Sequence, residues 1–318
     1  MSHTPASHAG ISRRRLLQAG AVGFGALITG ALVGPATTAQ AAETVVKLPG
    51  FSAFASSVRT LRSGKYYLVE SNGLPPHNMM VGITSWQQQV PAPQPYTGSN
   101  AWRIPVQPKR AANPVSATDN LFRGAIALAV DGIPIFNAKN NRGDISAEIG
   151  ELDQWGGHCG RADDYHYHAA PLHLSKTVGA TKPIAYALDG YLLYGAVEPD
   201  GSAMRPLDEY NGHDYKGGYH YHGTTSYPYI NGGMRGVVTV TDGQVDPQPF
   251  LRPFRPDGKP LPGAKITDFA RSGSSDFALT YTLGGGAYHV GYTATLQSVS
   301  MTFTDPSGQQ SHETYSRR

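Results

Sequence analysis

Short apolar runs broken by glycine and proline recur along most of the chain. Two of them, Ala125–Val130 and Ile133–Phe136, flank the dipeptide Asp131-Gly132, and two more, Ile184–Leu188 and Tyr191–Tyr194, flank a second Asp-Gly. Apolar runs of this kind around Asp-Gly predict β-hairpins closed by two-residue turns. We therefore expect two similar hairpins in the middle of the chain.

A Tyr-His-Tyr-His tetrad follows each predicted hairpin. The tetrads occupy residues 165–168 and 219–222, and a Leu-Asp pair precedes them by 13 positions in the first copy and 12 in the second. Three blocks in the same order at nearly the same spacing indicate an internal duplication. Both copies are thus predicted to form the same unit, a hairpin followed by a His-x-His strand.

Helical spacing is weak and confined to one segment. Apolar residues in Ile145–Trp155 recur at helical intervals, with Asp144 as a possible cap and Gly156 as a stop, whereas proline and glycine interrupt the second copy there. We expect one short helix at most.

The C-terminal part predicts a small antiparallel β module. Its predicted strands are Phe277–Leu283, Ala287–Tyr292, Ser298–Thr304 and His312–Tyr315. Six prolines between residues 244 and 262 predict a linker. The expected organisation is a duplicated domain over 42–243, a proline-rich linker over 244–265 and the β module over 266–318, in a fold that is mainly β with minor α+β character.

Composition excludes several classes of protein. The chain of 318 residues contains 38 Gly and 24 Pro, which argues against a helical bundle or coiled coil. Charged residues make up only 15%, which gives no support to a nucleic-acid partner, and a single cysteine excludes a disulfide framework within the chain. The sequence also lacks a phosphate-binding loop, a Gly-x-Ser-x-Gly elbow and a cysteine-rich zinc pattern.

Residues 1–41 resemble a twin-arginine export signal. Arg13-Arg14-Arg15 precedes a Gly- and Ala-rich apolar run, Ala19–Val33, and Ala39-Gln40-Ala41 fits a signal-peptidase site. The run is too short for a stable membrane anchor. We expect a secreted or periplasmic protein whose mature chain starts near Ala42. Removing the signal takes away three arginines and no acid, so 23 basic residues face 23 acidic ones.

The tetrads carry the main candidate chemistry. Side chains alternate along a strand, so both histidines of a tetrad lie on one face and both tyrosines on the other. Two such imidazoles can chelate one divalent metal, and a histidine after glycine, eight residues before His166 or seven before His220, can supply a third ligand. The predicted ligands are His158, His166, His168, His213, His220 and His222. They could converge on one shared site or form one site in each half.

Two aspartates are candidates to support these ligands. Asp153 and Asp208 stand at matched positions in the Leu-Asp pairs, where they could fix a histidine tautomer, bind the metal directly or simply cap a turn. Imidazole ligands favour zinc or copper over calcium. The alternative is a metal-free platform of tyrosine and histidine that binds a small molecule or a cell-wall polysaccharide.

The same blocks resemble the bacterial YHYH protein family. The resemblance covers about residues 65–236 and rests on the two tetrads, the Asp-Gly hairpins and four further motifs, which are Asn72–His77, Gly157-His158, Asn211–His213 and Tyr227–Ile230. It implies a secreted or periplasmic protein but no particular activity. If the protein is an enzyme, an open position on a histidine-bound metal could activate water for hydrolysis or exchange electrons with oxygen. A purely structural surface protein is a third class.

Overall fold

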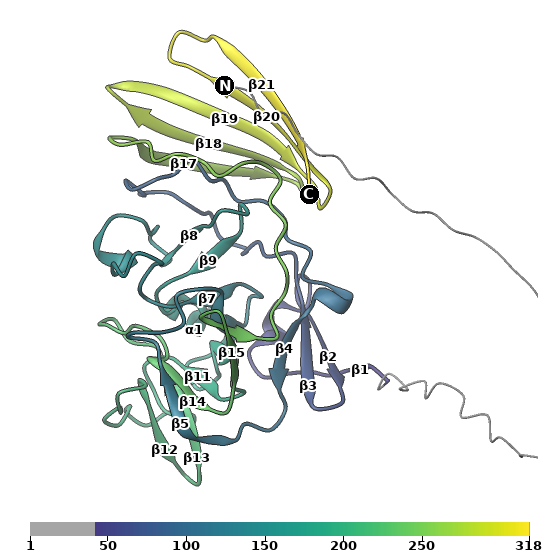
Figure 1. Cartoon of the computed structure of the whole chain (residues 1–318), viewed down its shortest axis with the longest axis vertical. Helices are drawn as coiled ribbons and strands as arrows, with labels where there is room; N and C mark the ends of the chain where they lie inside the picture. Colours follow the sequence, from purple (N-terminus) through teal and green to yellow (C-terminus); the bar gives the residue numbers. More distant parts are fainter. Residues whose placement is uncertain (1–41, 318) are drawn as a thin grey trace, which may run out of the picture. The chain divides into compact units, whose positions relative to one another are not determined.

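The computed structural model describes residues 42–317, so the predicted export signal lies outside the described residues. The chain from residue 42 onward forms one compact unit. Most of its regular elements are short strands (Figure 1), which confirms the expectation of a mainly β fold. No helix within residues 42–317 is long and apolar enough to cross a membrane.

A four-stranded antiparallel sheet forms the N-terminal part. Its strands run in the order β1-β2-β3-β4. Their bounds are β1 Thr44–Val45, β2 Arg59–Ser63, β3 Tyr66–Glu70 and β4 Trp102–Pro105. Two short 3-10 turns, Phe51–Phe54 and Gly98–Asn100, join these elements.

The duplicated region folds into one eight-stranded sheet. The strands of the first copy are β6 Ala125–Ala129, β7 Pro134–Phe136, β8 Gly157–Cys159 and β9 Tyr165–Tyr167. Those of the second copy are β10 Ala185–Ala187, β11 Leu192–Tyr194, β12 Gly212–Tyr215 and β13 Gly218–His222. Their order in the sheet is β12-β13-β11-β10-β6-β7-β9-β8.

This order is symmetric about its centre. β6 pairs with β10 in antiparallel fashion, and on either side a hairpin strand runs parallel to its tetrad strand, β7 beside β9 and β11 beside β13. β8 and β12 then close the two ends. The duplication predicted from the sequence is therefore confirmed as two equivalent halves of one sheet, with β8 and β9 far from β12 and β13 (Figure 1).

The turns of the hairpins differ from the prediction. The amide of Ala129 donates to the carbonyl of Ile133, so three residues, Val130 to Gly132, form the loop rather than two. A two-residue turn of type I′ needs positive φ at both of its central residues. In the described loop only Gly132 has positive φ, at 84°, as expected for a type I turn that ends in a bulge.

Residues 42–317 contain one short α-helix, within the expected number, but it lies outside the segment with helical spacing. Only Ser146–Glu148 within Ile145–Trp155 is helical, as a single 3-10 turn. Gly150 has a φ of 75°, and its carbonyl accepts the amides of Thr84 and Ser85, so tertiary contacts use the group that a helix would need. The described α-helix is one turn, α1 (Ser175–Val178), which follows a 3-10 turn at Leu172–Leu174.

Two small ribbons connect the main sheets. β5 (Arg110–Ser116) pairs with β14 (Gly233–Gly236), and β15 (Thr239–Thr241) pairs with β16 (Gln244–Asp246). The first ribbon places β14 next to the second hairpin loop, because Gly236 donates its amide to Asp189 at 2.8 Å. β14 thus lies against the side of β13 that carries the tyrosines.

The C-terminal residues form the predicted antiparallel meander, with one strand more than the sequence indicated. Its strands are β17 Lys265–Ser272, β18 Asp276–Leu283, β19 Gly286–Ala294, β20 Ser298–Thr304 and β21 Gln310–Ser316. The meander docks on the rest of the unit: Ile266 exchanges backbone bonds with Gly82 and Ile83, and the Tyr292 hydroxyl donates to Pro91. The predicted domain boundaries at 243 and 265 remain predictions.

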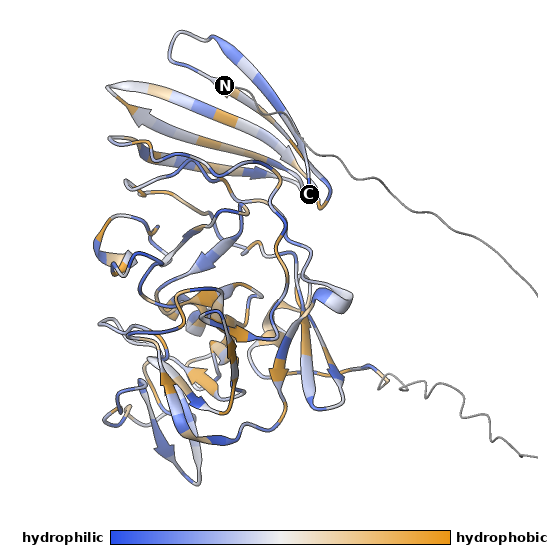
Figure 2. Ribbon diagram, viewed as in Figure 1, coloured by the Kyte–Doolittle hydropathy of each residue, from blue (hydrophilic) through white to orange (hydrophobic). Residues whose placement is uncertain are grey.

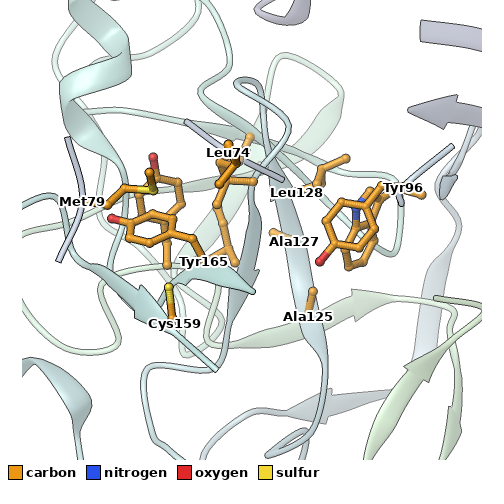
Figure 3. Close-up of a cluster of buried hydrophobic side chains, with 14 of the residues drawn as sticks. Leu74, Met79, Tyr96, Ala125, Ala127, Leu128, Cys159 and Tyr165 are labelled. Atoms are coloured by element: carbon orange, nitrogen blue, oxygen red, sulfur yellow. The ribbon is translucent and has the colours of Figure 1, made fainter. Parts of the chain in front are cut away.

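One hydrophobic core connects these parts. The central strand β6 is fully buried along its length, and core residues of the meander, such as Leu279, belong to the same cluster. Apolar residues concentrate in the central strands (Figure 2), and Leu74, Met79, Cys159 and Tyr165 pack together beside β9 (Figure 3). The single cysteine is free and buried there, and burial raises the pKa of its thiol.

Candidate metal centres

The first three predicted ligands converge in the first half of the sheet. His158 on β8 lies directly opposite His166 on β9, and His168 follows on the same face. One ring nitrogen from each histidine lies within 4.8 Å of the others. The Nε2 atoms of His166 and His168 are 3.1 Å apart. We call these three residues the first triad.

The second half builds the same arrangement, which we call the second triad. His213 on β12 lies opposite His220 on β13, with His222 two residues further on. The Nε2 atom of His220 is 3.0 Å from that of His213 and 2.9 Å from that of His222. A fourth group joins this triad, because Glu198 is fully buried and its carboxylate is 3.1 Å from Nε2 of both His213 and His220.

The two triads are separate sites. The tetrad strands β9 and β13 are separated by four other strands of the sheet. At about 4.8 Å between neighbouring strands, this separation amounts to roughly 24 Å. A single ion or a dinuclear centre cannot bridge that distance, so the sequence alternative of one shared site is excluded for these residues.

The hydrogen bonds of the first triad fix its tautomers. Nδ1 of His166 faces the carbonyl of Asp164 at 3.0 Å, and Nδ1 of His168 faces the carbonyl of Asn137. A carbonyl oxygen only accepts, so each Nδ1 carries the proton and each Nε2 presents a bare lone pair. Two lone pairs that meet at 3.1 Å repel each other unless a cation lies against both.

The second triad repeats this arrangement. Nδ1 of His222 donates to the carbonyl of Gly195 at 2.7 Å, and Nδ1 of His213 lies 3.3 Å from the carbonyl oxygen of Pro206. Gly195 and Asn137 stand at the same place after their hairpins, so both halves orient the second tetrad histidine through the same backbone carbonyl. This places Nε2 of His213 and His222 toward the centre of the group.

Burial favours the neutral form of four of the triad imidazoles. Desolvation lowers the pKa of His168 to about 3 and that of His220 to about 4, and it lowers the pKa values of His158 and His222 as well. Neighbouring histidines add to the effect. Neutral imidazole is the form that binds metals.

Asp153 and Asp208, our candidates to fix a tautomer, bind metal or cap a turn, accept backbone amides of the turns that follow them and also hold tyrosines. Tyr165 donates its hydroxyl to Asp153 at 2.8 Å, and Tyr219 donates to Asp208 at 3.0 Å. Asp153 also accepts the backbone amide of Met80. Among residues 42–317, no described bond joins either carboxylate to a histidine of the triads.

Two other acidic residues, Asp164 and Glu198, contact the triads. Asp164 lies 3.3 Å from Nδ1 of His166 through its carboxylate, and Glu198 lies within the second triad. Asp164 directly precedes its tetrad, a signal that the sequence offered. Glu198 follows the second hairpin, where the first copy has Asn140, so comparison of the two copies pointed away from a carboxylate.

A third group lies on the tyrosine face of the first half. His77, Asp131 and His173 bring one ligand atom each to within 4.8 Å of one another. Nε2 of His77 is 2.8 Å from the Tyr167 hydroxyl, which donates to Asp131 at 2.8 Å. His77 thus approaches the sheet from outside the duplication, but on the opposite face of β9 from the first triad.

The comparisons with known proteins agree with this architecture. The family model described as YHYH protein matches residues 101–205, which include the first hairpin, the first triad and the second hairpin. No curated protein and no solved structure shows significant similarity to the chain. With its tetrad strands, its duplicated hairpins and this match, the chain carries a YHYH domain.

Proposed function

We propose that the protein binds two divalent transition-metal ions, one in each triad. The observation that carries this proposal is the contact between Nε2 of His166 and Nε2 of His168, both of which lack a proton, in a buried site. A buried polar atom without a partner destabilises a fold by about 1 to 3 kcal/mol. A metal ion at the centre of each triad would remove this cost in both halves.

Ligand chemistry favours zinc or copper. Imidazole nitrogen suits zinc, copper, iron and nickel, whereas calcium and magnesium prefer oxygen ligands. Three histidines with a fourth position left for water, or three histidines and Glu198, match the two usual ligand sets of four-coordinate zinc. The carbonyl partners of Nδ1 support the same reading, because such bonds orient ligating imidazoles in metal sites.

We also propose that the protein acts outside the cytoplasm. The consecutive arginines and the small-residue cleavage pattern in residues 1–41 support export by the twin-arginine route. For activity, a histidine-bound metal with a free position supports hydrolysis by activated water or electron exchange with oxygen. Both classes require an accessible metal.

Metal analysis of the tag-free, full-length protein tests the proposal. We expect two equivalents of zinc or copper per chain. His166→Ala with His168→Ala, and His220→Ala with His222→Ala, should each leave one equivalent, with an unchanged circular dichroism spectrum.

A matched control is His289→Ala with His312→Ala, since both histidines lie in the C-terminal meander and bond to threonines. This variant should keep two equivalents. Folded protein that takes up no metal and instead binds cell-wall polysaccharide would contradict the proposal and support the alternative of a metal-free binding module.

A further inference from the structure

Glu198 and Asn140 occupy equivalent positions in the two halves. Each residue starts a tight loop after its hairpin. The backbone amide of Asn140 donates to the carbonyl of Asp144, and the backbone amide of Glu198 donates to the carbonyl of Ser202. The amides of Gly143 and Gly201 donate back to the carbonyls of Asn140 and Glu198, respectively. Isolated bridges at Lys139 and Val197 repeat the correspondence one residue earlier. The duplication therefore places a carboxylate at one triad and an amide at the other.

The amide side chain of Asn140 is not directed at the first triad as a ligand. Its Oδ1 accepts the backbone amides of Arg142 and Asp144, and its Nδ2 donates to Glu151 at 3.2 Å. Glu151 is itself bound to the Arg142 guanidinium. Within residues 42–317, no carboxylate oxygen joins His158, His166 and His168 in the way that Glu198 joins the second triad.

The two triads also differ in the cavities beside them. All three histidines of the first triad line a cavity of about 590 Å³, together with Phe136, Asn140 and Arg142. A smaller pocket of about 370 Å³ lies beside the second triad, and only His220 of that triad borders it. A ligand in the larger cavity would therefore lie beside all three histidines of the first triad.

Charge favours an anion at the first triad. Three neutral imidazoles would leave the full double positive charge of the ion, whereas Glu198 would reduce it at the second triad. Two acids on the cavity wall form ion pairs, Glu151 with Arg142 and Asp257 with Arg161, and the carboxylate of a third, Asp164, lies 3.3 Å from Nδ1 of His166. Arg123 and Lys139 also line the cavity and form no ion pair with another described residue.

We propose that the two centres have different roles: the first triad holds a metal with an open coordination position that takes a small anion or an anionic group of a substrate, and Glu198 closes the second. This inference rests on the proposed metal binding. It makes the first triad the reactive centre and the second a structural one.

Cobalt substitution with azide as the probe tests the proposal. The first triad is isolated by His220→Ala with His222→Ala, and the second by His166→Ala with His168→Ala. We expect azide to change the visible cobalt spectrum of the first isolated site in a saturable way and to leave that of the second unchanged.

Exchange of the equivalent residues sharpens the test. Glu198→Asn in the second isolated site should make it respond to azide, and Asn140→Glu in the first should weaken azide binding at least tenfold. Asn140 also supports its loop. If Asn140→Glu does not fold for this reason, the azide response of Glu198→Asn decides the test. Equal responses at both wild-type sites, or no response at the first, would overturn the assignment of roles. Absence of cobalt binding at both sites would instead overturn the proposed function.

Discussion

Leu128 on β6 lies directly opposite Tyr186 on β10, and this pair marks the centre of the eight-stranded sheet. Every strand on one side of it has its counterpart on the other. The equivalent halves have diverged in burial and in polar contacts, so each half supplies a matched control for substitutions in the other. Three of the four predictions below use matched pairs of this kind or contrast buried with exposed groups.

The triads should retain metal in acid. Protonation competes with metal for imidazole, and this competition begins only when the pH approaches the pKa of the ligand. Because the pKa of His168 is lowered to about 3 and that of His220 to about 4, protons should not displace a metal from these two ligands at pH 5. Metal content after filtration between pH 7 and pH 3 measures this, and loss centred near pH 6.5 would be inconsistent with neutral buried triads.

Tyr165→Phe should destabilise the fold more than Tyr219→Phe. The Tyr165 hydroxyl donates to Asp153 in a fully buried setting, so its removal should lower the free energy of unfolding by about 1 to 2 kcal/mol. Tyr219 makes the equivalent bond to Asp208 where the pair is partly exposed, so water can replace it and the loss should be smaller. Urea denaturation compares the two variants; equal losses would contradict the argument, and metal content should not change in either.

Asp131→Asn should gain stability relative to the native protein as the pH rises. Burial raises the pKa of Asp131 to about 7, so the folded state retains a proton that the unfolded state, with an ordinary aspartate pKa near 4, releases earlier. As the pH rises from about 4 to about 7, this group therefore lowers the free energy of unfolding of the native protein by up to about 4 kcal/mol. The asparagine variant has no such loss, because its side chain does not titrate.

Asp189→Asn is the control for that substitution. Asp189 accepts the Tyr221 hydroxyl and the amide of Gly236, and the second of these bonds has no counterpart at Asp131. Its pKa is also raised by burial, but the additional donor stabilises the charged form. Denaturation at pH 4.5 and pH 8 should show the larger relative gain for Asp131→Asn, and equal gains would argue against a role for the Gly236 amide.

Arg255→Ala should unfold the protein more readily than Arg161→Ala. Arg255 forms two hydrogen bonds, of 2.9 and 2.8 Å, with the buried carboxylate of Asp163. Removing one partner of a buried ion pair leaves an uncompensated charge and lowers stability by about 3 to 5 kcal/mol. Arg161 pairs with Asp257 at 3.6 Å on the surface, where such pairs contribute about 0 to 1 kcal/mol.

The Arg255 variant also tests the predicted linker over residues 244–265. Phe254 in this segment is only 1% exposed and packs in the main core. A loose linker predicts little change in the melting temperature of either arginine variant. A large loss of melting temperature in Arg255→Ala but not in Arg161→Ala would show that the segment stabilises the unit.

The sequence predicted the parts of the site that depend on local geometry. Alternation along a strand places His166 and His168 on one face, and the matched spacing of His158 and His213 correctly indicated a third histidine in each half. For Asp153 the structure shows one of the roles that the sequence left open, the cap of a turn. Asp153 contacts Tyr165 because both side chains lie on the face of β9 away from the first triad.

Tertiary contacts account for the other differences. Helical spacing in Ile145–Trp155 was overridden because Gly150 binds Thr84 and Ser85 through its carbonyl, a contact between distant segments. Glu198 was missed because its role depends on a loop that folds back onto the tetrad strand. Neither the strand period nor the comparison of the two copies carries that information.

The antiparallel join between β6 and β10 constrains how either repeat could exist by itself. Both strands are buried along their whole length, and in β6 alanine alternates with isoleucine and leucine. A single repeat without the other would expose this row of amides, carbonyls and small apolar side chains. Such an unpaired edge tends to pair with a strand of another chain. A one-repeat polypeptide would thus be stable only as a pair, and fusion of two such units into one chain frees each to alter its own centre while the other keeps the original chemistry.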